Sequence, residues 1–95
     1  MVDAALLRRA SRELPAWQLA GEEIVGRWRF PDFSSALAAA VRVGALAERA
    51  DHHPELRVAW GLLEVRLTTH AAKALTERDL DLAAAIQAAL QPPRS

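Results

Sequence analysis

The sequence predicts an α+β protein, in which three helices pack on one face of a four-stranded antiparallel sheet. Two regions alternate apolar and polar residues, and each contains a turn signal, so we expect hairpins over 16–30 and 56–70. Three other segments repeat apolar residues with helical spacing, at 3–13, at 33–49 and after Thr76. The expected order of elements is therefore α-β-β-α-β-β-α.

The first helix and the first hairpin are bounded by residues that start and stop such elements. Asp3 is placed to cap the first helix, and Pro15 ends it. A turn-like "GEE" then separates "AWQLA" from "IVGRWRF". In "IVGRWRF" the apolar residues alternate with period two, which is typical of a half-buried strand.

The central helix has an unusually narrow polar strip. Asp32 is placed to cap a helix that runs from Phe33 to about Arg49. At about 100° per residue its polar side chains fall on one line, formed by Ser35, Arg42 and Arg49. A helix that is apolar almost all round is covered on more than one side. We therefore expect one side on the sheet and another against a second subunit.

The second hairpin and the last helix complete the pattern. The alternation of apolar residues slips at Gly61–Leu62, which indicates either a turn or a bulge, and we expect a tight hairpin. The last helix opens with "TERD", in which Thr76 is the cap. Asp79 is placed to reach back from the third helical position, as in a variant of the capping box.

The composition narrows the class of protein. The 95 residues fit a single domain over residues 1–95, and a core this small favours self-association. Twelve basic side chains balance twelve acidic ones, so no nucleic-acid or membrane partner is expected on electrostatic grounds. The chain has no cysteine, no signal-peptide pattern and no long apolar run, so we expect a cytoplasmic protein.

Chemistry is most plausible around "ERADHHPEL", residues 48–56, which contain two of the three histidines. Glu48 falls on the apolar side of the central helix, where it needs a partner unless it reaches solvent in a frayed last turn. His52 follows four residues later, so the two side chains lie one above the other if the helix persists. Pro54 keeps His53 extended, so the adjacent histidines point in different directions.

The remaining candidate residues have two interpretations each. His70 ends a strand on its polar face, as an ordinary exposed residue or as part of a site. Trp17, Trp28 and Trp60 either line a flat pocket for an aromatic ligand or belong to the core. The histidine spacing matches no strong zinc signature, so we expect no metal.

Taken together, the spaced residues resemble the signature of the pterin-4a-carbinolamine dehydratase family. The flanking segments "WRFPDF" and "LTTHAAKALTERDLDLA" are similar to that family as well, and Trp17 matches the tryptophan of its first strand. The resemblance covers about residues 14–90. The signature residues are Glu48, His52, His53, Pro54, Trp60, His70 and Asp79.

This resemblance implies both a fold and an activity. The family fold is a four-stranded antiparallel sheet with helices on one face, and its members form homodimers or homotetramers. The implied enzyme is a hydro-lyase that dehydrates a 4a-hydroxytetrahydropterin to the quinonoid dihydropterin. It recycles the pterin after an aromatic amino acid hydroxylase has used it, and it needs no metal or organic cofactor.

The resemblance also implies roles for the matching residues. His52 and His70 become the acid/base pair, and His53 binds or orients the pterin. Glu48 tunes His52 or hydrogen-bonds the pterin ring. Asp79 either caps the last helix or orients the site through His70. Trp17 and Trp60 complete the substrate-binding set.

The departures from the family pattern are mild. Trp60 stands where many members have tyrosine, which puts substrate preference in doubt. Ala74 and Ala16 stand where glycine is frequent. Two alternatives to the dehydratase are a protein-dimerisation module of the transcriptional-coactivator kind, acting through helix 33–49, and a protein that binds another pterin.

Overall fold

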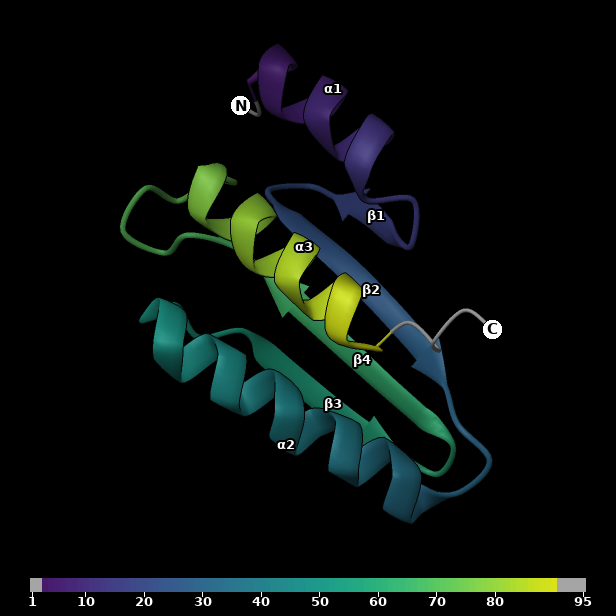
Figure 1. The fold of residues 1–95 in the computed structure, drawn as a ribbon. Coiled ribbons are helices and arrows are strands. Elements are labelled where there is room, and N and C mark those ends of the chain that lie inside the picture. Colours follow the sequence, from purple (N-terminus) through teal and green to yellow (C-terminus); the bar gives the residue numbers. More distant parts are fainter. Residues whose placement is uncertain (1–2, 91–95) are drawn as a thin grey trace.

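The computed structural model describes residues 3–90 and confirms the predicted fold class and order of elements. Figure 1 shows a sheet crossed by helices, with the N-terminal helix at one end of the molecule. The elements are α1 (Ala4–Glu13), β1 (Trp17–Ala20), β2 (Glu23–Arg29), α2 (Phe33–Ala50), β3 (Glu55–Ala59), β4 (Leu62–Leu67) and α3 (Glu77–Leu90).

The two predicted hairpins lie side by side in one sheet of strand order β1-β2-β4-β3, and every neighbouring pair is antiparallel. Both tight turns contain a glycine in the left-handed region, Gly21 with φ 64° and Gly61 with φ 69°. Glycine adopts this conformation without a steric penalty, which explains its position in both turns. The slip of the alternation at Gly61 is therefore a hairpin turn, as expected.

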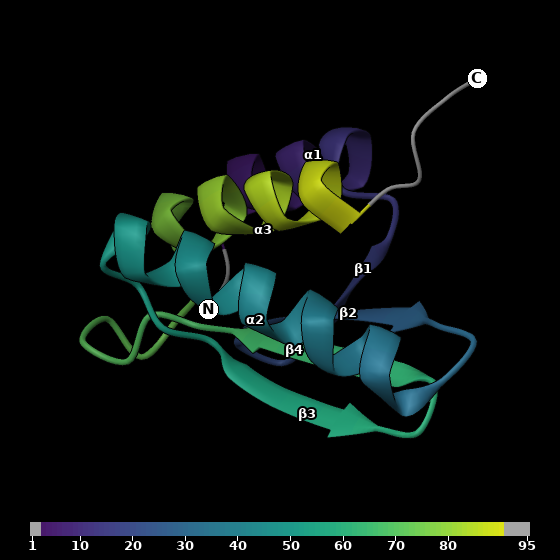
Figure 2. The ribbon, with the colours of Figure 1, turned by 60° about the horizontal axis from the view of Figure 1, so that its bottom comes forward.

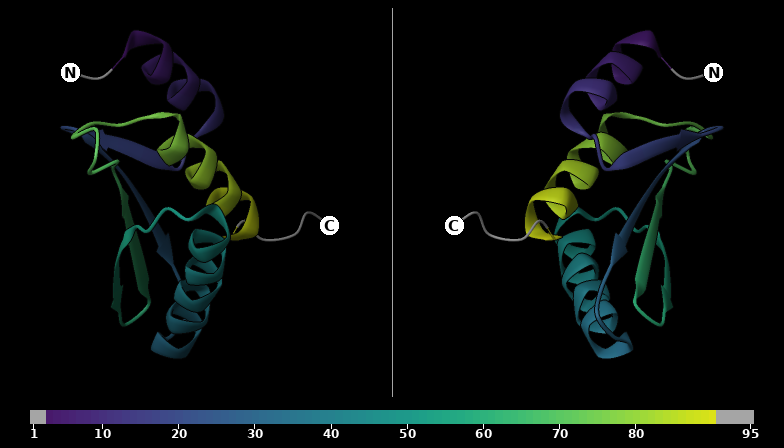
Figure 3. Two further views of the ribbon diagram at one scale, coloured as in Figure 1. Left: turned by 90° about the vertical axis from the view of Figure 1, so that its left-hand side faces the viewer. Right: turned by 90° about the vertical axis from the view of Figure 1, so that its right-hand side faces the viewer.

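All three helices cover the same face of the sheet, which is plain in the side views of Figures 2 and 3. The helix caps are those predicted: Asp3 Oδ1 accepts from the Ala5 N–H at 2.8 Å, and Asp32 Oδ1 accepts from the Ser35 N–H at 2.7 Å. The core fills the space between the sheet and the helices. The largest of its fully buried apolar side chains are Leu14, Ile24, Val43, Leu63, Val65, Leu67, Leu80 and Ile86.

The central helix α2 has an apolar side that nothing in the described chain covers. Its alanine-rich inner side packs on the sheet, while Phe33, Leu37 and Val41 are 45%, 46% and 68% exposed. Arg42, from the predicted polar strip, donates to the Ala89 carbonyl at the end of α3 at 3.0 Å. A cation in this position stabilises the carboxyl end of a helix.

Two glycines provide a test of how tightly the core is packed. A Cβ on Gly26 would lie 2.5 Å from the Trp28 ring, and that ring is fixed by an edge-to-face contact with Trp17. Gly26→Ala should therefore lower the free energy of unfolding by about 1–3 kcal/mol, because the core is overpacked. Urea denaturation measures this change.

Gly44→Ala is the matched control, because a Cβ at this helical position would meet no atom of residues 3–90 within 4 Å. It should raise the free energy of unfolding by about 0.5–1 kcal/mol, as alanine is the better helix former. Equal effects at the two positions would contradict the packing described here.

Candidate active site

The end of α2 separates the two adjacent histidines. Asp51 adopts a left-handed conformation with φ 50° and ψ 45°, and the His52 N–H returns to the Ala47 carbonyl at 3.1 Å. This bonding pattern closes the helix at Ala50. The expected stacking of His52 over Glu48 is therefore wrong, because the helix ends before residue 52. The expected divergence of His52 and His53 is confirmed.

His52 points into the protein. It is 8% exposed, and its Nε2 lies 2.5 Å from Oδ1 of Asp79, which is completely buried. Sequence reasoning expected Asp79 either to cap α3 or to orient the site through His70. The carboxylate contacts His52 instead of His70, so that second expectation has the wrong histidine.

Asp79 is also the capping carboxylate that was predicted for α3. Its Oδ2 accepts from the Thr76 N–H at 2.9 Å and from the Thr69 hydroxyl at 2.7 Å. A buried carboxylate is expensive unless several donors compensate it. Three donors from three separate segments meet this one side chain.

His53 and Glu48 form a second, exposed histidine–carboxylate pair. His53 Nε2 lies 2.7 Å from Glu48 Oε1, and the two side chains are 58% and 78% exposed. Glu48 therefore does reach solvent, and its partner is His53 rather than His52. Because both groups are solvated, this pair orients the imidazole more than it stabilises the fold.

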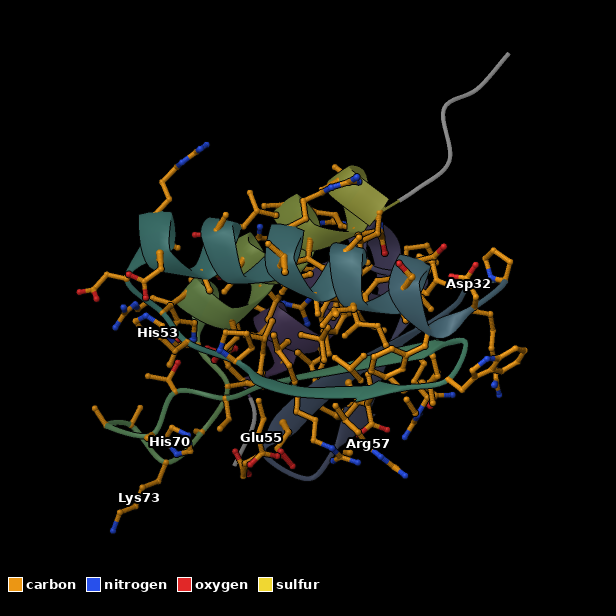
Figure 4. All side chains as sticks on the ribbon, turned by 90° about the horizontal axis from the view of Figure 1, so that it is seen from below. Asp32, His53, Glu55, Arg57, His70 and Lys73 are labelled. Carbon is orange, nitrogen blue, oxygen red and sulfur yellow. The ribbon has the colours of Figure 1, made fainter. Side chains whose placement is uncertain are left out.

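His70 lies on a tight turn directly after the last strand. The turn is closed by hydrogen bonds from the Ala72 N–H to the Thr69 carbonyl and from the Lys73 N–H to the His70 carbonyl, both at 3.1 Å. Lys73 is left-handed, with φ 55°. The His70 side chain is exposed at the same end of the sheet as His53 (Figure 4).

The structure brings His53 and His70 together in one small polar pocket. Figure 4 shows both labelled side chains, with Glu55, at the end of the sheet opposite Asp32. His52 lines a different hollow, beside Arg78 and Asp81 of α3. The residues around the polar pocket are Glu23, His53, Glu55, Arg66, Thr68 and His70.

Three neighbouring strands supply the charges of this pocket. Arg66 of β4 donates to Glu23 of β2 at 3.4 Å and to Glu64 of its own strand at 3.0 Å. Glu64 also accepts from Arg27 at 2.9 Å, and the Arg66 hydrogen bond is the main reason that the pKa of Glu64 lies below its ordinary value. The ion-pair network thus fixes the guanidinium of Arg66 beside the histidines.

Neither tryptophan of the predicted substrate-binding set lines this pocket within the chain. Trp17 is 7% exposed and packs edge-to-face on Trp28, with 5.3 Å between ring centroids. Trp60 is 74% exposed in the β3–β4 turn. It follows Glu55 by five residues of extended chain, which is roughly 16 Å. Trp17 is thus a core residue, and Trp60 lies at the other end of the strand.

A larger cavity lies away from the histidines, between α1, β1 and the start of α3. Apolar side chains dominate its lining, among them Leu6, Leu14, Trp17 and Leu75. It offers few groups for proton transfer. The smaller histidine pocket is therefore the candidate active site.

Sequence reasoning missed Thr69 and Glu23. Thr69 continues the inward-facing row of Leu63, Val65 and Leu67, so a hydroxyl in that row was the available signal. Glu23 comes to the pocket only through the pairing of β2 with β4. A single sequence does not indicate which strands of the two hairpins pair with each other.

Among residues 3–90 no group of three or more metal-ligating side chains could hold a metal ion. Within the same range, no helix has the length and apolar character needed to cross a membrane.

Fold and site together define a class: a small α+β protein with histidines from two segments around a polar pocket, an arrangement suited to proton transfer. The model of the family described as pterin 4 alpha carbinolamine dehydratase matches residues 2–89. The chain therefore belongs to the pterin-4a-carbinolamine dehydratase family.

Individual relatives agree with this assignment. A protein of Rhodopseudomonas palustris (strain BisB18), named "Putative pterin-4-alpha-carbinolamine dehydratase", is 48% identical over 81 residues, which cover 83% of this chain and 80% of that protein. A protein of the same name from Prochlorococcus marinus (strain MIT 9313) is 38% identical and covers 90% of each chain.

Solved structures show the same fold. A transcriptional coactivator/pterin dehydratase from Brucella melitensis matches with a TM-score of 0.83 and 32% identity, over 92% of this chain and 95% of that one. A pterin dehydratase-like protein, described as a RuBisCO assembly factor in the alpha-carboxysome, matches in fold with a TM-score of 0.66 at 20% identity. This second match covers 80% of this chain and 90% of that one.

The charge network of the pocket gives stability a defined pH dependence. Because the pKa of Glu64 is lower in the folded state, its ion pairs stabilise the fold above the ordinary glutamate pKa. This stabilisation should disappear as the pH falls through the folded-state pKa. Thermal unfolding at several pH values checks this.

Glu64→Gln should flatten the acid limb of this stability profile. Glu48→Gln, which alters an exposed carboxylate away from the network, is the matched control and should leave the acid limb steep. If both variants behaved like the unmodified protein, the Arg27–Glu64–Arg66 network would not be the source of the effect.

Proposed function

We propose that the protein is a hydro-lyase that dehydrates 4a-hydroxytetrahydropterin to quinonoid dihydropterin. The observation that carries the proposal is the pocket shared by His53 and His70, in a chain that belongs to the dehydratase family. In this role the protein acts in the cytoplasm and recycles pterin for aromatic amino acid hydroxylation. It uses no metal or organic cofactor.

The reaction requires two proton transfers. The C4a–O bond breaks as the hydroxyl oxygen receives a proton, and water leaves. The proton on N5 is removed, and the electron pair of that N–H bond forms the C4a=N5 double bond. Imidazoles that titrate near neutral pH suit both steps, each worth about 10²–10⁴-fold in rate.

The geometry supports a division of labour among the histidines. His70 is exposed in the pocket, and among residues 3–90 no carboxylate pairs with it as with the other two histidines, so we assign it one of the proton transfers. His53, oriented by Glu48 and lining the same pocket, binds or orients the pterin. The resemblance to the family gives the second proton transfer to His52, which is fixed by Asp79 and lines a neighbouring hollow beside the shared pocket.

The polar walls of the pocket suit a pterin. The ring carries both hydrogen-bond donors and acceptors along its edge. Glu23 and Glu55 offer acceptors and Arg66 offers donors, while Thr68, whose hydroxyl proton is donated to the Glu22 carbonyl at 2.7 Å, offers a further acceptor. These groups match the polar edge of such a heterocycle better than they match an apolar or purely anionic ligand.

The histidine variants should separate catalysis from stability. His70→Ala should lower kcat about 10²–10⁴-fold with no change in the free energy of unfolding, because its side chain is solvated. His52→Ala should lower kcat and also the free energy of unfolding by about 3 kcal/mol, because it leaves the buried Asp79 without its histidine. The decay of 4a-hydroxypterin absorbance and urea denaturation measure the two quantities.

Arg57→Ala is the control for this series, since Arg57 lies outside the pocket on the same face of the sheet (Figure 4). It should leave turnover unchanged. A wild-type rate no higher than the uncatalysed background would refute the proposed activity itself.

A second candidate function, protein association through α2, is favoured by the exposed apolar side of that helix. Phe33, Leu37 and Val41 lie one helical turn apart and are all well exposed. We propose that this surface joins copies of the chain into a homodimer or homotetramer. A protein of another kind, bound at the same surface, would give the chain the coactivator-like role that is the alternative to turnover.

A substitution in this surface tests the association. Leu37→Glu should convert the oligomer to a monomer in sedimentation velocity, because a charge would be buried at the contact. Leu19→Glu, which changes an equally exposed leucine on β1, is the control and should leave the oligomer intact. A wild-type chain that sediments as a monomer at micromolar concentration would contradict this proposal.

A further inference from the structure

The Thr69 hydroxyl lies between two oxygen atoms that impose a direction on it. Thr69 Oγ1 is 2.7 Å from Thr76 Oγ1 and 2.7 Å from Asp79 Oδ2. An ionised carboxylate only accepts hydrogen bonds, and a hydroxyl has one proton to donate. Thr69 therefore donates to Asp79, and Thr76 donates to Thr69.

The two oxygens of Asp79 are consequently different. Oδ2 receives the Thr69 hydroxyl and the Thr76 N–H, at 2.7 and 2.9 Å. Oδ1 faces Nε2 of His52 at 2.5 Å. Since Oδ1 is also an acceptor, the neutral imidazole of His52 must carry its proton on Nε2. Its lone pair is then on Nδ1.

We propose that Thr76, Thr69 and Asp79 form a directional hydrogen-bond chain that holds His52 in its Nε2–H tautomer. Nδ1 is then the nitrogen through which His52 exchanges protons in the dehydration. The tautomer follows from the hydrogen bonds of an ionised Asp79, whereas the catalytic use of Nδ1 rests on the proposed function. Thr69 and Thr76 are positioning residues in this scheme, because they act through Asp79.

The hydrogen-bond chain predicts that Asp79→Asn reverses the tautomer of His52. The amide oxygen of asparagine must take the place of Oδ2, because the Thr76 backbone N–H points there and cannot reverse. The amide NH₂ then occupies the place of Oδ1 and donates to Nε2 of His52. The neutral imidazole is thereby forced into the opposite tautomer, with its proton on Nδ1.

Nitrogen-15 NMR of the imidazole rings reads the tautomer directly. The chain has three histidines, so the His53→Ala/His70→Ala double variant leaves His52 as the one imidazole and makes its assignment certain. At a pH high enough for His52 to be neutral, we expect the Nε2–H tautomer in this double variant. Adding Asp79→Asn should invert the pattern to Nδ1–H.

Asp81→Asn is the matched control, because it removes the same charge from the same helix. Asp81 lines the hollow beside His52 but pairs with Arg9 at 2.9 Å. The tautomer of His52 should not change in this variant. An Nδ1–H tautomer without the Asp79 change, or an Nε2–H tautomer with it, would overturn the proposal, and the first reading stands even if Asp79→Asn fails to fold.

Thr69 is tested by its conservative and its hydrophobic replacement. Thr69→Ser keeps the donor, and Thr69→Val removes it with little change in volume. The Nε2 proton of His52 should exchange with solvent at the wild-type rate in the serine variant and at least tenfold faster in the valine variant. Equal exchange rates in the two variants would show that Thr69 is not part of the hydrogen-bond chain.

Activity is measured separately, in variants that keep His53 and His70. With the wrong tautomer, Asp79→Asn should lower kcat strongly with little change in KM; the same replacement beside the catalytic histidine of a serine protease costs about 10⁴-fold. An inverted tautomer with unchanged kcat would refute the role of Nδ1 but leave the hydrogen-bond chain intact. A protein without dehydratase activity would refute the proposed function and leave the tautomer test unaffected.

Discussion

The buried carboxylate of Asp79 is the constraint on which the site depends. An unpaired charge in this position would be strongly destabilising, so the fold must bring donors to it from three places. These are His52 after α2, Thr69 after β4 and Thr76 at the start of α3. Both histidines of the pocket are chain neighbours of these donors, since His53 follows His52 and His70 follows Thr69. The group that stabilises the interior thus also positions the exposed imidazoles.

The alternation of side chains along the chain explains why one histidine or threonine is buried against Asp79 and the next residue faces the pocket. In extended chain, successive side chains point to opposite sides. His52 and Thr69 are buried against Asp79, while His53 and His70 are exposed one residue later. Each segment therefore uses one residue to fix itself to the core and the next to face the pocket. Moving either segment along the chain by one residue would exchange the two roles.

Much of this organisation was predictable from the sequence, because it depends on local signals. Helix caps such as Asp32, period-two strands and the turn at Gly61 predicted every element, and residue spacing identified the three histidines. The partners of these residues were not predictable in the same way. A left-handed Asp51 ends α2 before His52, so Glu48 pairs with His53 and leaves His52 to Asp79. Spacing along a helix says nothing about the geometry after the helix ends.

The pocket also depends on the register of the sheet, which no single strand determines. Arg66 lies opposite Glu55 of β3 on one side and opposite Val25 of β2 on the other, so its pocket neighbours come from both flanking strands. A slip of one residue would turn Arg66 toward the core and a leucine or valine toward the pocket. The tight turn at Gly61 sets the register of the β3–β4 hairpin. Glycine is required in this turn, because a Cβ at position 61 would lie 2.9 Å from the Phe30 carbonyl. A glycine at the far end of the hairpin thereby maintains the charge pattern around the histidines.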